Sequence, residues 1–356
     1  MSGERVLVAM SGGVDSSLAA HLLKSRGADV VGVFIRSTFT AGGDGSLRCL
    51  SDAAAADAGR VADRLGIPLE VLDFTEDFER LIDHFCAEYG RGRTPNPCVL
   101  CNRDLKFGRL FECADRLGAD LLATGHYARV EWEAGRWRLK RGLDPEKDQS
   151  YFLFPIEGAR LARVRLPLGE MTKSEVRRMA AETGLPVHDR PESQDACFVG
   201  GSVADLVRRR RPDLVRPGPV LDTGGREVGR HDGIVHFTIG QRRGLGVAVG
   251  EPRYVVAIRP EDDAVIIGPA EALRSRGLVA EDVVWHDNVP AEPIRADVRI
   301  RHRHGPAPAW LERLGAERAE VRFDEPQPAV TPGQAAVFYR DDRVLGGGWI
   351  ARAIGG

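Results

Sequence analysis

A short segment rich in glycine and serine, close to the start of the chain, constrains the fold more than any other feature. Ser11-Gly12-Gly13-Val14-Asp15-Ser16-Ser17 follows the apolar run Val6–Met10 and leads into a helix-forming stretch. A strand, a glycine turn and a helix in succession aim backbone N–H groups and the positive end of a helix dipole at a bound anion. The segment lacks the Lys-Ser/Thr ending of a Walker loop, so simple hydrolysis of a terminal phosphate is disfavoured.

The first half of the chain alternates between apolar runs and amphipathic stretches. The expected strands are Val6–Met10, Val30–Ile35, Leu69–Phe74 and Leu121–Thr124, and the expected helices are Ser16–Arg26, Ala53–Leu65, Phe78–Tyr89, Leu105–Leu117 and Lys173–Thr183. Ala128–Glu133 and Arg136–Arg141 flank a glycine turn and predict a β-hairpin. Such alternation predicts an α/β fold with a doubly wound parallel sheet and a ligand at the carboxyl ends of its strands.

Short β-runs separated by glycine and proline replace this pattern in the second half. We expect three domains: a nucleotide-binding catalytic domain over 1–203, a small β-rich central domain over 204–275, and a C-terminal β-barrel over 276–356. A chain of 356 residues is long enough for each of them to bury a core.

The composition limits the classes of function. The formal net charge is −2, so nucleic-acid binding has to depend on local basic clusters. No signal peptide is expected, and no apolar run is long enough to cross a bilayer. Six cysteines without secretory features favour a reducing, cytoplasmic environment.

Two of the cysteines lie in polar surroundings that are unusual for an inert thiol. Cys101 follows a loop with prolines at 95 and 97, and is expected at the start of the Leu105–Leu117 helix, where the dipole favours a thiolate. Cys197 ends the polar run Glu192–Ala196. The other thiols of the first half are expected to be inert and buried, namely Cys49, Cys86 and Cys113.

In this order, the motifs resemble the tRNA-uridine 2-sulfurtransferase (tRNA-specific 2-thiouridylase) family of the ATP-pyrophosphatase superfamily. The resemblance covers nearly the whole chain and rests on Ser11–Ser17, Asn96–Asn102, Thr124–Arg129, Lys147–Phe152, Leu166–Gly169, Ser193–Phe198, Phe237–Arg242, Thr331–Gln334 and Leu345–Gly348. It implies that ATP adenylates the C2 oxygen of the wobble uridine of tRNA, and that sulfur then replaces AMP to give 2-thiouridine.

The resemblance also implies roles for single residues. ATP and Mg²⁺ would be bound by Ala9, Met10, Ser11, Gly12, Gly13, Val14, Asp15, Ser16, Ile35 and Gly125. Cys197 would receive sulfur from a cysteine desulfurase or a sulfur-relay protein and carry it as a persulfide. Cys101 would be its nucleophilic partner, leaving a Cys101–Cys197 disulfide. The anticodon arm of tRNA would contact Asn96, Pro97, Cys98, His126, Asp148, Gln149, Ser150, Arg301, His302 and Gln334.

One basic cluster is also a candidate for phosphate contacts on its own pattern. Arg299, Arg301 and Arg303 alternate along an expected strand, which would place all three guanidinium groups on one face. The run Arg208–Arg211 is interpreted as a solvated surface.

The chain departs from the well-studied branch of the family at Cys98, where that branch has aspartate. Cys98, Cys101 and Cys197 together are enough to hold a four-iron cluster with one iron open for sulfide. We place the persulfide route ahead of this alternative. Two competing functions remain: an ATP-pyrophosphatase that acts on a small molecule, and a tRNA-binding module without catalysis. A small-molecule enzyme would have no use for the cysteines. A binding module without catalysis would have no use for the phosphate loop.

Overall fold

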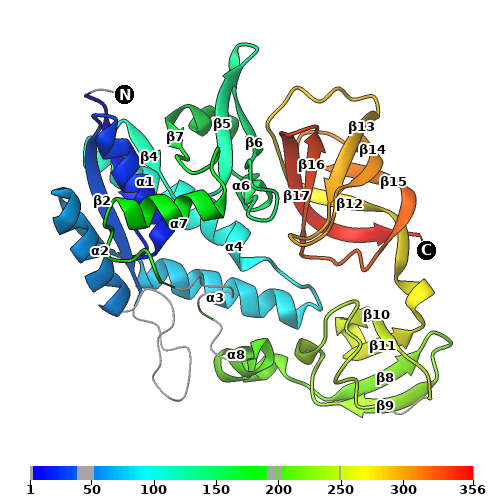
Figure 1. Ribbon diagram of the computed structural model, residues 1–356. Coiled ribbons are helices and arrows are strands. Elements are labelled where there is room, and N and C mark those ends of the chain that lie inside the picture. Colours follow the sequence, from blue (N-terminus) through cyan, green and yellow to red (C-terminus); the bar gives the residue numbers. More distant parts are fainter. Residues whose placement is uncertain (1–2, 38–51, 191–197, 199–201, 248–249, 356) are drawn as a thin grey trace. The chain divides into compact units, whose positions relative to one another are not determined.

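The computed structural model describes residues 3–37, 52–190, 198, 202–247 and 250–355 (Figure 1). Contacts within the chain divide it into two compact units. The first unit comprises Met1–Arg80, Cys98–Gly200 and Asp342–Val344, and the second comprises Leu81–Pro97, Gly201–Asp341 and Leu345–Gly356. The expected division into three domains at residues 203 and 275 stays a prediction.

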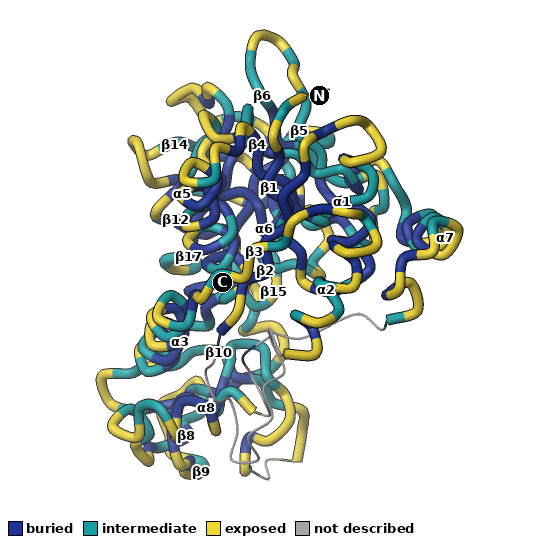
Figure 2. Tube along the Cα trace, turned by 90° about the vertical axis from the view of Figure 1, so that its left-hand side faces the viewer, coloured by how far each residue is buried: buried dark blue, intermediate teal, exposed yellow. Residues whose placement is uncertain are grey.

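A five-stranded sheet with strand order β3-β2-β1-β4-β7 forms the centre of the first unit. All neighbouring strands pair in parallel, and they are β1 (Arg5–Ala9), β2 (Asp29–Arg36), β3 (Leu69–Asp73), β4 (Leu121–Ala123) and β7 (Val164–Arg165). On one face of the sheet, Val6 and Val8 point into a core that contains three helices. On the opposite face of the sheet, Leu7 is fully buried. The sheet is therefore covered on both faces, and β1 runs through buried surroundings (Figure 2).

Three helices fill that core: α1 (Val14–Ser25), α2 (Asp52–Leu65) and α7 (Lys173–Glu182). The remaining helical segments are α3 (Thr75–Gly90), which spans the boundary between the units, α4 (Pro97–Leu100), the π-helix η1 (Cys101–Arg109), α5 (Leu110–Arg116), α6 (Ser150–Leu153) and the 3₁₀ helix η2 (Gly158–Arg163). The predicted hairpin is present as β5 (Ala128–Glu133) and β6 (Arg136–Arg141). The α/β class and the parallel sheet predicted from the sequence are confirmed.

The second unit contains a small sheet and a barrel. The small sheet has the order β10-β11-β8-β9 and follows α8 (Val203–Arg210) and η3 (Pro212–Leu214). Its segments are β8 (Gly218–Asp222), β9 (Glu227–His231), η4 (Ile234–His236), β10 (Tyr254–Arg259), η5 (Pro260–Asp262), β11 (Ala264–Gly268) and η6 (Ala270–Leu273).

The predicted β-barrel at the end of the chain is also present. Six strands follow the order β12-β15-β14-β13-β16-β17, and pairing of β12 with β17 closes them into a barrel. They are β12 (Arg274–Trp285), β13 (Ile294–Arg299), β14 (Ala307–Arg313), β15 (Ala319–Pro328), β16 (Ala335–Arg340) and β17 (Arg343–Ile354). Alternate residues such as Val298, Ala309 and Val321 fill its interior.

One predicted strand is wrong. β13 ends at Arg299, and residues 301–304 form a turn. Arg299 stabilises that turn by donating to the carbonyl oxygens of His302 and His304. Arg299, Arg301 and Arg303 therefore do not alternate on one strand face, and Arg299 is a structural residue of the loop.

Across the described part of the chain, no helix combines the length and the apolar character needed to cross a membrane.

Candidate nucleotide and sulfur-transfer site

The phosphate loop lies at the carboxyl end of β1 and is held by its own serines. Ser16 Oγ accepts from Ser11 N (3.1 Å) and donates to Gly13 O (3.1 Å), and Ser17 Oγ donates to the same carbonyl oxygen (2.8 Å). Gly12 has φ of +73°, and a Cβ on it would lie 2.4 Å from Ala54 O. The loop is therefore rigid, and Gly12 cannot be replaced without moving α2. Its free N–H groups and the start of α1 can bind an anion.

Asp15, in the first turn of α1, is bound by two side chains from distant parts of the chain. Lys173 Nζ lies 2.6 and 2.8 Å from its two carboxylate oxygens, and the Tyr127 hydroxyl donates to it at 2.8 Å. The Lys173 side chain is only 11% exposed. A second cation, Arg190, donates to Gly12 O (2.9 Å) and pairs with Asp57. Two cations thus converge on the phosphate loop.

Neither cation was expected from the sequence. Lys173 is the first residue of α7, which Thr172 and Glu175 cap reciprocally. A lysine is unfavourable at the positive end of a helix dipole, and burial makes it more so. A lysine directly after the N-cap threonine, inside the Thr-x-x-Glu capping pattern, is the signal that the sequence offers. Arg190 offers no comparable sequence signal.

The other residues expected to bind ATP lie at the same edge of the sheet as the phosphate loop. Ala9 ends β1, and Met10 N donates to Val33 O of β2 (2.8 Å), two residues before Ile35. Gly125, just after β4, packs so tightly on the loop that a Cβ would lie 2.8 Å from both Asp15 C and Ser16 N. The parallel sheet therefore brings Ala9, Ile35 and Gly125 to the edge that carries Asp15.

The segment that carries Cys98 and Cys101 is helical earlier than the sequence suggested. Helical turns begin at Pro97, so Cys98, and not Cys101, lies in the first turn. The segment η1 does begin at Cys101, but the helical turns before it start at Pro97, a first helical position where proline is favoured, so Cys101 does not lie at the helix N-terminus that the sequence suggested. From Cys101 the chain forms a π-helix, a geometry common at functional sites. Buried Asn102 donates to Phe152 O (3.1 Å) and anchors this segment on α6.

The other thiols divide as expected where the structure describes them. Cys86 and Cys113 are buried, and burial raises the pKa of Cys86 to about 11, which keeps it a thiol. Cys98 is exposed, Cys101 is partly exposed, and neither is in a disulfide. Cys49 and Cys197 lie outside the described residues. The proposed pairing of Cys101 with Cys197 therefore stays a prediction.

Most of the first-unit residues that were expected to contact tRNA form hydrogen bonds inside that unit. Asp148 Oδ1 accepts from Gly142 N (3.1 Å) and Ser150 N (3.0 Å), and Ser150 is fully buried. Gln149 exchanges two hydrogen bonds with the backbone of Tyr127, at 2.9 and 2.8 Å. Tyr127 also donates a hydrogen bond to Asp15. Gln149 therefore supports the phosphate loop indirectly, through Tyr127. The contact of Asp148, Gln149 and Ser150 with tRNA stays a prediction.

His126 is held as a neutral imidazole. Its Nδ1 lies 2.7 Å from Thr124 Oγ1, and its ring packs against Phe107. Burial, and then the charge of Lys106, keep the pKa of His126 well below its ordinary value. At neutral pH it can form hydrogen bonds but cannot pair with a phosphate as a cation.

The expected contacts in the second unit are dispersed. Arg301 and His302 lie in the turn after β13, where Arg301 Nη1 is 3.5 Å from Pro328 O. Gln334 precedes β16 and donates to Thr94 O, two residues before Asn96. Asn96 and Pro97 fall in the second unit, whereas Cys98 belongs to the first.

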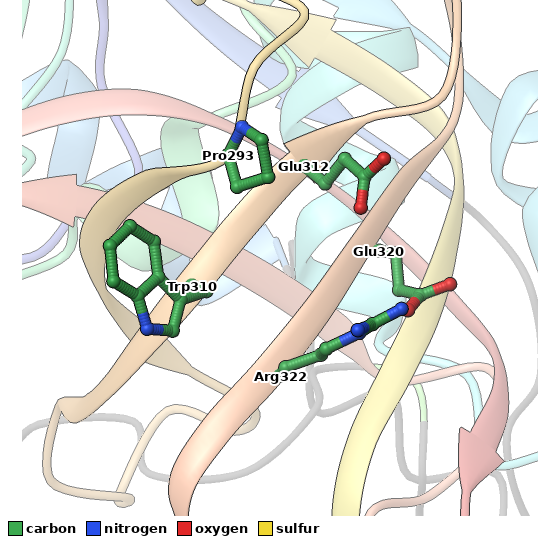
Figure 3. Close-up of a pocket in the computed structure, with 5 residues that line it drawn as sticks. All are labelled: Pro293, Trp310, Glu312, Glu320 and Arg322. Atoms are coloured by element: carbon green, nitrogen blue, oxygen red, sulfur yellow. The ribbon is translucent and has the colours of Figure 1, made fainter.

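A separate hollow of about 240 Å³ lies on the outer face of the barrel (Figure 3). It is lined by Pro293, Trp310, Glu312, Glu320 and Arg322, and Arg322 pairs with Glu320. Two carboxylates against one guanidinium give this hollow a negative charge, which does not suit the phosphates of ATP. This hollow is therefore a poor candidate for a nucleotide site, and the phosphate loop stays the predicted one.

Fold and site together define a class of protein: a phosphate-loop α/β domain with a cysteine loop in the same compact unit, joined to a β-rich segment and a β-barrel. Comparison with known protein families divides the chain into the same three parts. Residues 4–201 match the tRNA methyl transferase HUP domain, residues 205–269 the tRNA methyl transferase PRC-barrel domain, and residues 275–350 the aminomethyltransferase beta-barrel domain.

Similarity to individual proteins is more specific. The tRNA-specific 2-thiouridylase MnmA of Carboxydothermus hydrogenoformans is 49% identical over 360 residues, which covers 99% of this chain and 98% of the relative. The protein of the same name from Geobacter metallireducens is 50% identical over 363 residues, with 99% and 98% covered. The chain belongs to the tRNA-specific 2-thiouridylase family.

Likeness to solved structures is weaker. A 4-thiouridine synthetase in complex with RNA and ATP shares 20% identity at a TM-score of 0.38, covering 59% of this chain and 51% of that chain. A similarity of this size carries no argument about function.

Proposed function

We propose that the protein uses ATP to thiolate the wobble uridine of tRNA at C2, releasing AMP and pyrophosphate. The observation that carries the proposal is the presence, in one compact unit, of a phosphate loop backed by Lys173 and of the Cys98–Cys101 loop. Family membership over nearly the whole chain supports the same reaction. Since the substrate is tRNA and the thiols have to be kept reduced, we expect the protein to act in the cytoplasm.

The phosphate loop and its two cations fit cleavage between the α- and β-phosphates of ATP. The uracil C2 oxygen attacks the α-phosphorus and displaces pyrophosphate, whose new charge needs stabilisation. The N–H groups of the loop and the start of α1 would bind the pyrophosphate, and Lys173 and Arg190 supply positive charge beside them. Mg²⁺ on the phosphates needs one or two carboxylates. Asp15 is a carboxylate at the loop, and it would have to release one of its two bonds to Lys173 to hold the ion. When bound, Mg²⁺ would neutralise charge on the departing pyrophosphate.

Sulfur transfer then uses the cysteines. A cysteine desulfurase or relay protein supplies sulfur, which Cys197 carries as a persulfide. The terminal sulfur bonds to C2, and AMP departs with the former C2 oxygen. Cys101 thiolate bonds to the Cys197 sulfur as the terminal sulfur leaves it, so two thiols are oxidised to a disulfide while the transferred sulfur is reduced. A cellular dithiol then reduces the disulfide.

The alternative with an iron–sulfur cluster needs a third ligand beside Cys98 and Cys101. The described residues contain no group of three or more His, Cys, Asp or Glu side chains that could hold a metal, and Cys197 lies outside them. The routes separate in Cys98→Ser: an active, iron-free variant supports the persulfide route, whereas an inactive variant, with stoichiometric iron in the wild type, supports the cluster.

The function itself is tested with anticodon-arm transcripts that carry uridine or cytidine at the wobble position. We expect AMP, pyrophosphate and 2-thiouridine only with the uridine transcript and a sulfur donor, measured by nucleotide chromatography and nucleoside mass spectrometry. AMP formation without any RNA would instead indicate a small-molecule synthetase. Binding of tRNA without ATP cleavage would indicate a module without catalysis.

A further inference from the structure

The carboxylate of Asp15 is bound unequally at its two oxygens. Oδ1 accepts from the Tyr127 hydroxyl at 2.8 Å and from Lys173 Nζ at 2.6 Å. Oδ2 accepts from Lys173 Nζ at 2.8 Å and from no other residue in the described part of the chain. The Asp15 side chain is 32% exposed, so a ligand can reach it from solvent. Such a ligand can replace Lys173 at Oδ2 without breaking the bond to Tyr127.

The main chain of Asp15 is fixed, so the direction of its carboxylate depends on its side-chain partners. Asp15 lies in the first turn of α1, and Ser17 N donates to Gly13 O across it (3.2 Å). Gly125 packs against it so closely that a Cβ there would lie 2.8 Å from Asp15 C. Only the side-chain torsions of Asp15 remain free to turn the carboxylate.

Tyr127 is a fixed partner. The residue is 2% exposed and belongs to the core that contains α1, α2 and α7. Tyr127 N donates to Gln149 Oε1 (2.9 Å), and Tyr127 O accepts from Gln149 N (2.8 Å). Gly142 packs against the same carbonyl group, since a Cβ there would lie 2.7 Å from Tyr127 O. The hydroxyl therefore stays in one place and directs Asp15 whatever Lys173 binds.

Lys173, in contrast, can leave Asp15 while its own main chain stays in place. It is the first residue of α7, and its N donates to Asp144 Oδ2 at 3.0 Å. The ammonium group is carried on a flexible aliphatic stem. The phosphates of ATP carry several negative charges against one on Asp15, so a nucleotide at the loop would compete for this group. Asp15 would then have room for another cation at Oδ2.

We propose that Tyr127 is a positioning residue: it holds Asp15 by Oδ1, so that Oδ2 binds the ion of Mg–ATP once Lys173 has turned to the phosphates. This inference rests on the proposed function, which supplies the nucleotide and the ion. Mg²⁺ demands near-octahedral geometry and is held through one or two carboxylates together with substrate phosphates. A carboxylate that binds a metal is itself oriented by a hydrogen bond, and the Tyr127 hydroxyl makes that bond here.

The test measures the affinity for α,β-methylene-ATP, which cannot be cleaved between its α- and β-phosphates. Calorimetric titration gives its Kd once with excess Mg²⁺ and once with EDTA, and the ratio of the two values is the gain that the ion provides. Tyr127→Phe removes only the hydroxyl and keeps the ring in the core. Tyr89→Phe is the matched control, because Tyr89 is also buried and its hydroxyl is hydrogen-bonded to Thr238, but both residues lie in the second unit.

We expect Tyr127→Phe to raise the Kd with Mg²⁺ by about 10- to 100-fold, the usual effect of removing a group that orients a metal ligand, and to leave the Kd in EDTA unchanged. Tyr89→Phe should match the wild type under both conditions. Asp15→Asn should lose the gain from Mg²⁺. Adding Tyr127→Phe to Asp15→Asn should then have no further effect, because the tyrosine acts through Asp15.

An equal loss with Mg²⁺ and with EDTA would show that Tyr127 supports the loop as a whole, and would overturn the proposal. So would wild-type affinity of Tyr127→Phe in Mg²⁺, or a wild-type protein whose affinity does not depend on Mg²⁺. Should Tyr127→Phe fail to fold, Asp15→Asn decides, because a full gain from Mg²⁺ in that variant would exclude Asp15 as the ligand. No tRNA and no sulfur donor enter these titrations. A wild-type protein that makes no 2-thiouridine would therefore refute the proposed function and leave this measurement valid.

Discussion

Replacement of Gly125 by alanine tests how closely the edge of β4 supports the phosphate loop. A Cβ at this position would lie 2.8 Å from Asp15 C and from Ser16 N, and 3.0 Å from Asp15 O. Carbon atoms pack comfortably at about 3.5–4.0 Å, so the loop has to retreat by roughly 0.7 Å. The contacts are with main-chain atoms of α1, which cannot turn aside as a flexible side chain would.

The expected cost follows from that displacement. Overpacking of this kind destabilises a fold by about 1–3 kcal/mol. A shift approaching 1 Å in a group that positions substrate lowers activity by up to about 100-fold. We therefore expect Gly125→Ala to fold, to bind both ATP and inorganic pyrophosphate at least about tenfold more weakly, and to lose a similar factor in AMP formation.

Calorimetric titration with ATP and with pyrophosphate measures this effect. Gly59→Ala is the matched control, because Gly59 lies in α2 with no atom within 4 Å of an added Cβ. It should bind both ligands normally and gain up to about 1 kcal/mol from helix propensity. If Gly125→Ala weakens ATP but leaves pyrophosphate unchanged, Gly125 contacts adenosine and does not support the loop, and the reasoning is refuted. Wild-type affinity for both ligands would refute it as well.

Three further predictions follow from the same structure. Lys173→Met removes a buried cation 2.6 Å from Asp15 and should weaken ATP binding by about 1.5–3 kcal/mol in the same titration; unchanged affinity would exclude Lys173 from the phosphate site. Burial lowers the pKa of His126, so below about pH 6.5 the unfolded state binds more protons than the folded state. The free energy of unfolding should therefore fall as the pH decreases through that range, by at most about 1.4 kcal/mol per pH unit. Urea unfolding from about pH 7.5 to about pH 5.5 should show a shallower fall in His126→Gln, and equal slopes would contradict the burial argument. Arg301→Ala with Arg303→Ala should weaken tRNA binding and reduce its salt dependence by roughly one unit of slope per lost phosphate contact, and an unchanged slope would reject the contact.

The parts of the fold that depend on local pattern could be predicted from the sequence. Apolar runs predicted four of the five parallel strands described, all but β7, and the Ala134-Gly135 turn predicted the hairpin. Contacts between distant segments could not be predicted in this way. Asp15 and Lys173 are 158 residues apart, and no periodicity links them.

Two local predictions failed for identifiable reasons. The prolines at 95 and 97 suggested a loop as far as Cys101, yet a proline has no N–H to lose at the first position of a helix, and the helical turns begin at Pro97. The alternation of arginines after residue 298 suggested a continuing strand, yet Arg299 binds the carbonyl groups of the following turn and ends β13. In both cases the backbone hydrogen bonds decided the structure, and side-chain pattern alone did not reveal them.

The central claim is that ATP activates the C2 oxygen of uracil, and an oxygen label tests it most directly. An anticodon-arm RNA with ¹⁸O at C2 of the wobble uridine is incubated with the protein, ATP and a sulfur donor, and the AMP is analysed by mass spectrometry. If the C2 oxygen attacks the α-phosphorus, each AMP released with 2-thiouridine carries one ¹⁸O atom in its phosphate group. AMP without label, accompanied by labelled water, would contradict adenylation of uracil and with it the role assigned to the phosphate loop.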